Sequence, residues 1–80
     1  MNVLLFAGVR DKAGCDAIEL AVEFPAAAED ILAALVARVP EAAELIRVSR
    51  LAVADRYVGP NELVDDPVAE IALIPPVSGG

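Results

Sequence analysis

The chain has 80 residues, of which 58% are hydrophobic and only 4% aromatic, and its formal net charge is −7. This length gives one small domain with an aliphatic core of Leu, Ile and Val, and the acidic balance argues against nucleic acid, because phosphate binding needs a clustered basic surface. No apolar stretch approaches the ~20 residues of a membrane span and no basic segment precedes a signal-like run, so we expect a cytoplasmic protein with no membrane attachment.

Side chains that usually carry catalysis or hold metal ions are scarce. The chain has no histidine, and its one cysteine, Cys15, allows neither an intramolecular disulfide nor a cysteine-rich metal site. A nucleophilic Cys15 would need a basic neighbour, for which Arg10 and Lys12 are the nearest candidates, and a structural role is favoured instead. No glycine-rich phosphate loop is present. We therefore expect no metal, no stably bound cofactor and no self-contained catalysis.

The N-terminal part of the chain predicts a β-hairpin. Residues 2–7 form an apolar run that ends at a glycine, which is typical of a buried strand. Residues 17–24 alternate between apolar and other side chains up to a proline, which is typical of a half-exposed strand. Residues 10–16 are expected to be the connecting turn.

One long helix is expected at residues 26–39. Glu29 and Asp30 lie in its first turn and Arg38 in its last, which matches the helix dipole. Its apolar stripe at helical spacing comprises Ala28, Ile31, Leu32, Leu35 and Val39. A proline ends this helix, and residues 41–47 add a short helical turn.

Three further strands are expected at residues 51–54, 57–58 and 70–74, with a loop at 61–67. The order β-β-α-β-β predicts an α+β protein of the ubiquitin-like β-grasp type, with a mixed sheet of four to five strands wrapped on one main helix. The two terminal strands would run parallel at the centre of the sheet. Residues 1–75 form the expected domain, and residues 76–80 form a flexible tail that ends in Gly-Gly.

The first and last strands carry apolar side chains on both faces. The side expected to meet the helix carries Val3, Leu5, Ala7, Ile71 and Leu73. A single helix covers only one face of a sheet, so Leu4, Phe6 and Ile74 would be exposed together beside the root of the tail. Contiguous exposed apolar patches usually mark interaction surfaces, so these three residues are expected to bind a partner that also receives the tail. The alternative is a shifted register that buries them.

The last strand is followed by the segment Pro75-Pro76-Val77-Ser78-Gly79-Gly80. Its two prolines fix φ and lack an N–H, so the segment leaves the sheet as an extended arm. Its two glycines have no side chains and can thread a narrow channel. The carboxylate of Gly80 is the one group in the sequence that is placed for chemistry.

Both ends of the chain resemble the small subunit of molybdopterin synthase, a member of the ubiquitin-like sulfur carriers. The resemblance is carried by Val3-Leu4-Leu5-Phe6-Ala7-Gly8-Val9-Arg10 and by the Pro-Pro-Val-Ser-Gly-Gly ending, and it spans the chain in length and element order. Two turns depart from the family pattern. Ala54-Asp55 replaces a frequent Asn, and Asp66-Pro67-Val68-Ala69 replaces an Asp-Gly-Asp type of turn.

The resemblance implies a carrier whose C-terminus is modified only transiently. An ATP-dependent, E1-like adenylyltransferase would adenylate Gly80, and persulfide-derived sulfur would displace AMP to leave a thiocarboxylate. The tail, with Pro75 to Gly79 threading the channel, would then enter the large subunit of molybdopterin synthase in a heterotetramer. There it would donate sulfur to a cyclic pyranopterin phosphate, in the biosynthesis of the molybdenum cofactor. The large subunit would supply the catalytic side chains, and Phe6 and Ile74 match hydrophobic contact positions for it.

Three other functions remain open on the sequence. The chain could carry sulfur for thiamine thiazole or for a thiolated tRNA base, since such carriers share the fold and the Gly-Gly ending. It could be a protein modifier joined through Gly80 to target lysines, although Lys12 is its own only lysine and self-linked polymers would be few. It could also be a non-covalent interaction module.

Overall fold

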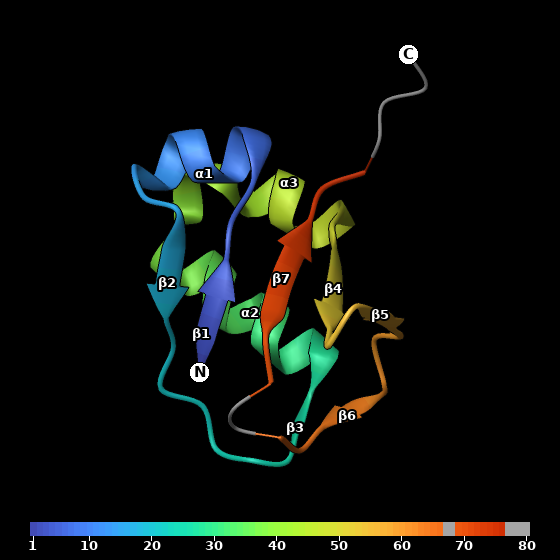
Figure 1. The fold of residues 1–80 in the computed structure, drawn as a ribbon. Helices are drawn as coiled ribbons and strands as arrows, with labels where there is room; N and C mark the ends of the chain where they lie inside the picture. Colours follow the sequence, from blue (N-terminus) through green and yellow to red (C-terminus); the bar gives the residue numbers. More distant parts are fainter. Residues whose placement is uncertain (67–68, 77–80) are drawn as a thin grey trace.

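The structure, a computed structural model, describes residues 1–66 and 69–76. Five strands form one mixed sheet in the order β2-β1-β7-β4-β5, and the helices lie together against one of its faces (Figure 1). The strands are β1 (Asn2–Leu4), β2 (Ala17–Glu19), β4 (Arg50–Val53), β5 (Arg56–Val58) and β7 (Ile71–Ile74). Strands β1 and β7 pair in parallel, and the other neighbours pair antiparallel. This is the predicted β-grasp arrangement, with the two terminal strands side by side.

The core lies between the inner sheet face and the helices. Alternation along the central strands buries Val3, Ile71 and Leu73, each at 1% exposure or less. From the helical side, Ile31 and Leu35 are fully buried, as the apolar stripe predicted. Every buried hydrophobic residue in the described part of the chain is Val, Leu, Ile or Ala, which confirms the predicted aliphatic core.

The predicted turn at residues 10–16 is wrong, because the chain forms a helix there, α1 (Ala7–Ala13). The first strand ends at Leu4, and Ala7, expected on the inner face, is exposed with a left-handed φ of 51°. Gly14 ends α1 with φ 75°, and its N–H donates to the carbonyl of Arg10 at 2.9 Å. The helix buries Val9, which a tight turn would leave in solvent. Strands β1 and β2 still pair as expected, with α1 between them.

The main helix, α2 (Ala28–Arg38), begins two residues later than predicted. Residues Ala26–Ala27 are instead strand β3, which pairs antiparallel with β6 (Leu63–Val64) in a separate two-stranded sheet. The predicted loop at 61–67 is therefore partly a strand, and the second predicted strand is limited to β2 rather than reaching residue 24. Strands of two residues, such as β3 and β6, are too short to produce a detectable alternation of apolar and polar side chains in the sequence.

Carbonyl groups from a distant loop satisfy the first N–H groups of α2. The N–H of Ala28 donates to the carbonyl of Glu62 and that of Glu29 donates to the carbonyl of Pro60, each at 3.0 Å. No side chain caps this helix, so these two bonds replace the usual Ser, Thr or Asp cap. The loop after β5 and the start of α2 are therefore held together.

Two short helical segments complete the helical layer, as the turn predicted at 41–47 indicated. These are η1 (Pro40–Ala42) and α3 (Ala43–Val48). Helix α1 packs closely on α3 at Gly8, where a β-carbon would lie 2.9 Å from Cδ2 of Leu45. Figure 1 shows α1 and α3 together at the end of the sheet from which the C-terminal segment leaves.

Candidate functional site

The sheet face opposite the helices carries the residues predicted to bind a partner. Leu4 on β1 and Ile74 on β7 are half-buried, and Phe6, just beyond β1, is 41% exposed. The parallel register places Leu4 opposite Ala72, two residues before Ile74 on β7, and Phe6 follows two residues after Leu4 at the start of α1. None of the three predicted residues is buried, so the alternative register that would bury them does not occur.

Tyr57 belongs to the same surface and was missed as a site residue. Its side chain is 56% exposed on β5, whereas its neighbour Val58 is buried. Antiparallel pairing sets Arg50 opposite Ile74, and the Arg50 guanidinium lies 5.9 Å from the centre of the Tyr57 ring. The Tyr57–Val58 alternation could have indicated an outward ring, but its distance from Ile74 depends on which strands are neighbours. We call Leu4, Phe6, Tyr57 and Ile74 the outer patch.

The C-terminal segment leaves the sheet beside this outer patch. Pro75 is half-buried and Pro76 is exposed, directly after the central strand β7. A small hollow of about 210 Å³ is lined by Val48, Arg50, Tyr57, Ile74, Pro75 and Pro76. We call it the tail-root hollow. The other residues expected in the tail, Val77, Ser78, Gly79 and Gly80, lie outside the described residues, and the domain boundary at residue 75 stays a prediction.

One exposed ion pair organises the loop next to this surface. Arg56 on β5 pairs with Glu62, and the side-chain hydrogen bond from Arg56 is the main cause that lowers the pKa of Glu62. The backbone N–H of Gly59, at 3.3 Å, lowers that pKa further, and the same ion pair raises the pKa of Arg56. Since Glu62 also supplies a carbonyl to α2, this pair supports structure rather than chemistry.

Within residues 1–66 and 69–76, no group of three or more His, Cys, Asp or Glu side chains could hold a metal ion. No helix in that part of the chain is long and apolar enough to cross a membrane. Cys15 is exposed, in the bend after α1. The described geometry is an apolar patch on the sheet face opposite the helices, with Pro75 and Pro76 leaving the sheet beside it.

Comparisons with known proteins agree with this geometry. A model of the ThiS family matches residues 3–80, whereas no match was found among curated proteins. The crystal structure of SAMP1 from Haloferax volcanii is 30% identical, with a TM-score of 0.78 over 100% of this chain and 98% of that chain. A second crystal structure, of small archaeal modifier protein 1 from H. volcanii, is 28% identical, with a TM-score of 0.78 and coverages of 96% and 97%. A Pyrococcus furiosus protein described as molybdopterin converting factor, subunit 1, is 26% identical, with a TM-score of 0.78 and 95% of each chain covered.

Proposed function

Because the chain belongs to the ThiS family and has its ubiquitin-like sulfur-carrier and modifier fold, we propose that it is the sulfur-carrying small subunit of molybdopterin synthase. One observation carries this proposal: Pro75 and Pro76 leave the central strand beside the outer patch. A single partner can therefore cover the patch and receive the tail at the same time. The ending Pro75-Pro76-Val77-Ser78-Gly79-Gly80 and the similarity to the P. furiosus protein support this choice of product.

The proposed chemistry takes place at the Gly80 carboxylate. A carboxylate oxygen attacks the α-phosphorus of ATP, pyrophosphate leaves, and an acyl-adenylate forms on an E1-like adenylyltransferase. Hydrosulfide then adds to the acyl carbon and AMP leaves, so a thiocarboxylate forms with no change of oxidation state. Gly79 and Gly80 have no β-carbon that would obstruct a channel or shield the acyl carbon. The large subunit would receive this tail and supply the catalytic side chains for sulfur transfer to a cyclic pyranopterin phosphate.

The proposal is tested by the intact mass of the chain after incubation with an E1-like enzyme, ATP and sulfide. Replacement of one oxygen by sulfur adds about 16 Da, a covalent change of the terminal group. The loaded chain, mixed with a large synthase subunit and cyclic pyranopterin phosphate, is expected to yield molybdopterin. Deletion of Gly80, or Gly80→Ala, is expected to leave the circular dichroism spectrum unchanged and to eliminate sulfur transfer. Molybdopterin formation at the normal rate by the deletion variant would refute the mechanism.

A protein modifier is the second candidate, because the two H. volcanii structures, at 28–30% identity, bear the names SAMP1 and small archaeal modifier protein. The same incubation, extended to a cell extract with ATP, separates the two functions. A ladder of conjugates joined through Gly80 to lysines would favour the modifier. A thiocarboxylate that gives no molybdopterin would favour a carrier for thiamine or tRNA thiolation. The proposal includes a location in the cytoplasm, because these pathways would need the chain there.

A further inference from the structure

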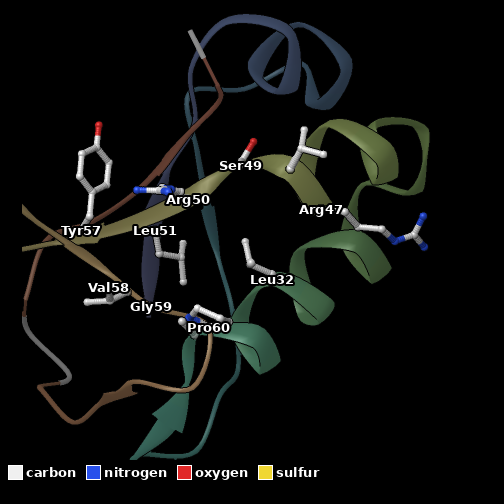
Figure 2. A pocket seen from close by; sticks show the side chains of 11 residues that line it. Leu32, Arg47, Ser49, Arg50, Leu51, Tyr57, Val58, Gly59 and Pro60 are labelled. Atoms are coloured by element: carbon white, nitrogen blue, oxygen red, sulfur yellow. The ribbon is translucent and has the colours of Figure 1, made fainter.

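A concave track runs from the tail root to the main helix, in three connected parts. The central groove, of about 430 Å³, lies between α2, α3 and the β4–β5 hairpin (Figure 2). It shares Val48, Arg50 and Tyr57 with the tail-root hollow. At its other end it shares Leu32 and Arg47 with a hollow of about 320 Å³ between α2 and α3. An extended chain lying in this track would pass from Pro76 toward α2.

The lining of the central groove is largely apolar, with Ala28 and Leu51 buried at its base and Val48 exposed at its edge. Figure 2 shows Leu32 of α2 and Leu51 of β4 directed into the groove from opposite walls, with Gly59 and Pro60 below them. Val48 is 60% exposed, which is unusual for a large aliphatic side chain. This lining can bury an apolar side chain of a ligand.

Two arginines lie where the parts of the track join, Arg50 at the tail-root end and Arg47 at the α2 end. The other arginines have acceptors: Arg10 pairs with Asp16, Arg38 donates to the carbonyl of Glu19, and Arg56 pairs with Glu62. Within the described part of the chain, neither Arg47 nor Arg50 has a carboxylate or carbonyl partner. Figure 2 shows the Arg47 guanidinium extended outward from α3 and Arg50 extended toward Tyr57.

The rest of the sequence makes this local charge distinctive. The chain has 13 acidic and 6 basic residues, so acidic side chains are numerous enough to pair with most of its lysine and arginine side chains. Two guanidinium groups that have no carboxylate or carbonyl acceptor among the described residues, on one largely apolar track, instead match a ligand that carries both carboxylates and an apolar side chain. Glu29 lines the hollow between α2 and α3, whereas no acidic side chain lines the central groove or the tail-root hollow. Acidic groups of a ligand therefore fit the section of the track between Arg47 and Arg50.

We infer that this track binds an extended acidic segment of the protein that also receives the C-terminal tail. Carboxylates of the segment pair with Arg47 and Arg50, and an apolar side chain between them enters the central groove. The apolar walls favour a peptide over a free phosphate, which would have no use for Leu32 or Val48. The choice of the protein that bears the segment rests on the proposed function, whereas binding of an acidic peptide to the track does not.

The experiment is an amide NMR titration of the full chain with a synthetic blocked peptide of alternating glutamate and leucine. A second peptide has glutamine in place of each glutamate. We expect shifts of the amides of residues 47–51 and 57–60 with the acidic peptide. We expect binding roughly three- to tenfold weaker with the glutamine peptide, as loss of two exposed ion pairs predicts. No enzyme or sulfur takes part, so failure here is distinct from failure of the proposed function.

The double variant Arg47→Gln with Arg50→Gln is expected to bind the two peptides equally. The control, Arg10→Gln with Arg38→Gln, changes the net charge by the same amount at arginines that already have acceptors, and it should keep the preference for the acidic peptide. Dispersed amide spectra verify that both variants are folded. Equal binding of both peptides by the unaltered chain, or shifts centred on α1 instead of the track, would overturn the inference. So would inorganic phosphate that reproduces the same shifts with equal affinity.

Discussion

Phe6 and Leu63 are both large exposed apolar residues, but they lie on different parts of the molecule. Phe6 is 41% exposed between β1 and α1, and Leu63 is 62% exposed on β6, which lies at the opposite end of the molecule from α1 in Figure 1. Phe6→Asp is expected to abolish association with the tail-receiving partner, because it places a charge in the outer patch. Size-exclusion chromatography of the mixture measures association, and circular dichroism should be unchanged. Leu63→Asp is the control and should associate normally; global unfolding of Phe6→Asp would instead place Phe6 in the core.

Glu62 is expected to make stability depend on pH. Arg56 lowers the pKa of Glu62 below its ordinary value of 4.5 in the folded chain. A carboxylate with a lowered folded pKa stabilises the fold above its unfolded pKa, and this contribution is lost as pH falls through the folded pKa. Arg56→Gln should raise the pKa of Glu62 toward its ordinary value, as measured by NMR of the side-chain carboxyl carbon. The variant should also lose less stability than the parent between pH 6 and pH 3, as measured in urea, and an unchanged pKa would contradict this account.

At single residues, the sequence was informative where local alternation decides orientation. The outward direction of Leu4, Phe6 and Ile74 is predictable from alternation along the first and last strands. The neighbouring residues of these strands are the apolar side chains that face the helix. Alternation could indicate that Tyr57 faces outward, but it could not place Tyr57, Arg47 and Arg50 on one surface. Their joint surface depends on β4 lying between β7 and β5 and on the groove that α2, α3 and the β4–β5 hairpin form together, and both are tertiary features.

At the level of elements, length decided what could be predicted. Helix α2 has three turns, so its apolar stripe and terminal charges were visible. Helix α1 has seven residues, too few for a clear helical period, and the apolar run before it continues to Ala7. Gly14, together with Arg10 and Lys12 in the last turn, was the available signal for a helix end. Glycine occurs both at helix ends and in turns, so Gly14 by itself also fits the turn that the sequence predicts.

The β4–β5 hairpin offers a stabilising change. Val53 pairs with Arg56, so the turn has two residues, Ala54 and Asp55, whose φ values are 50° and 66°. Both are left-handed, and such turns favour Asn-Gly. Ala54→Asn with Asp55→Gly is expected to stabilise the fold by about 1 kcal/mol, because it relieves left-handed strain at both positions. Urea denaturation measures this change. Gly14→Ala, at φ 75°, is the opposite case and should destabilise by about 1 kcal/mol; a loss of stability in the hairpin variant would show that the turn is not strained.

At the scale of the whole molecule, stability depends on a small core around the central strand. Leu73 is fully buried on β7 between β1 and β4. Leu73→Ala is expected to cost about 2–5 kcal/mol, through lost apolar burial and the cavity left behind. A chain of this size has a total stability of roughly 4–12 kcal/mol, so the loss would be a large part of it. Thermal unfolding should show a much lower midpoint, with Leu63→Ala nearly unchanged as the control, and equal midpoints for the two variants would contradict the burial of Leu73.

The place of β7 in the sheet has a consequence for synthesis of the protein. The last strand in the described part of the chain is the one that separates β1 from β4, so neither has its central neighbour until residue 74 has emerged. This sheet therefore cannot be completed from its N-terminal strands alone, unlike domains whose N-terminal part folds first. Chains that stop before β7 lack the middle of their sheet and expose their apolar residues to proteases and chaperones. The central part of the sheet is therefore complete only in chains that include β7.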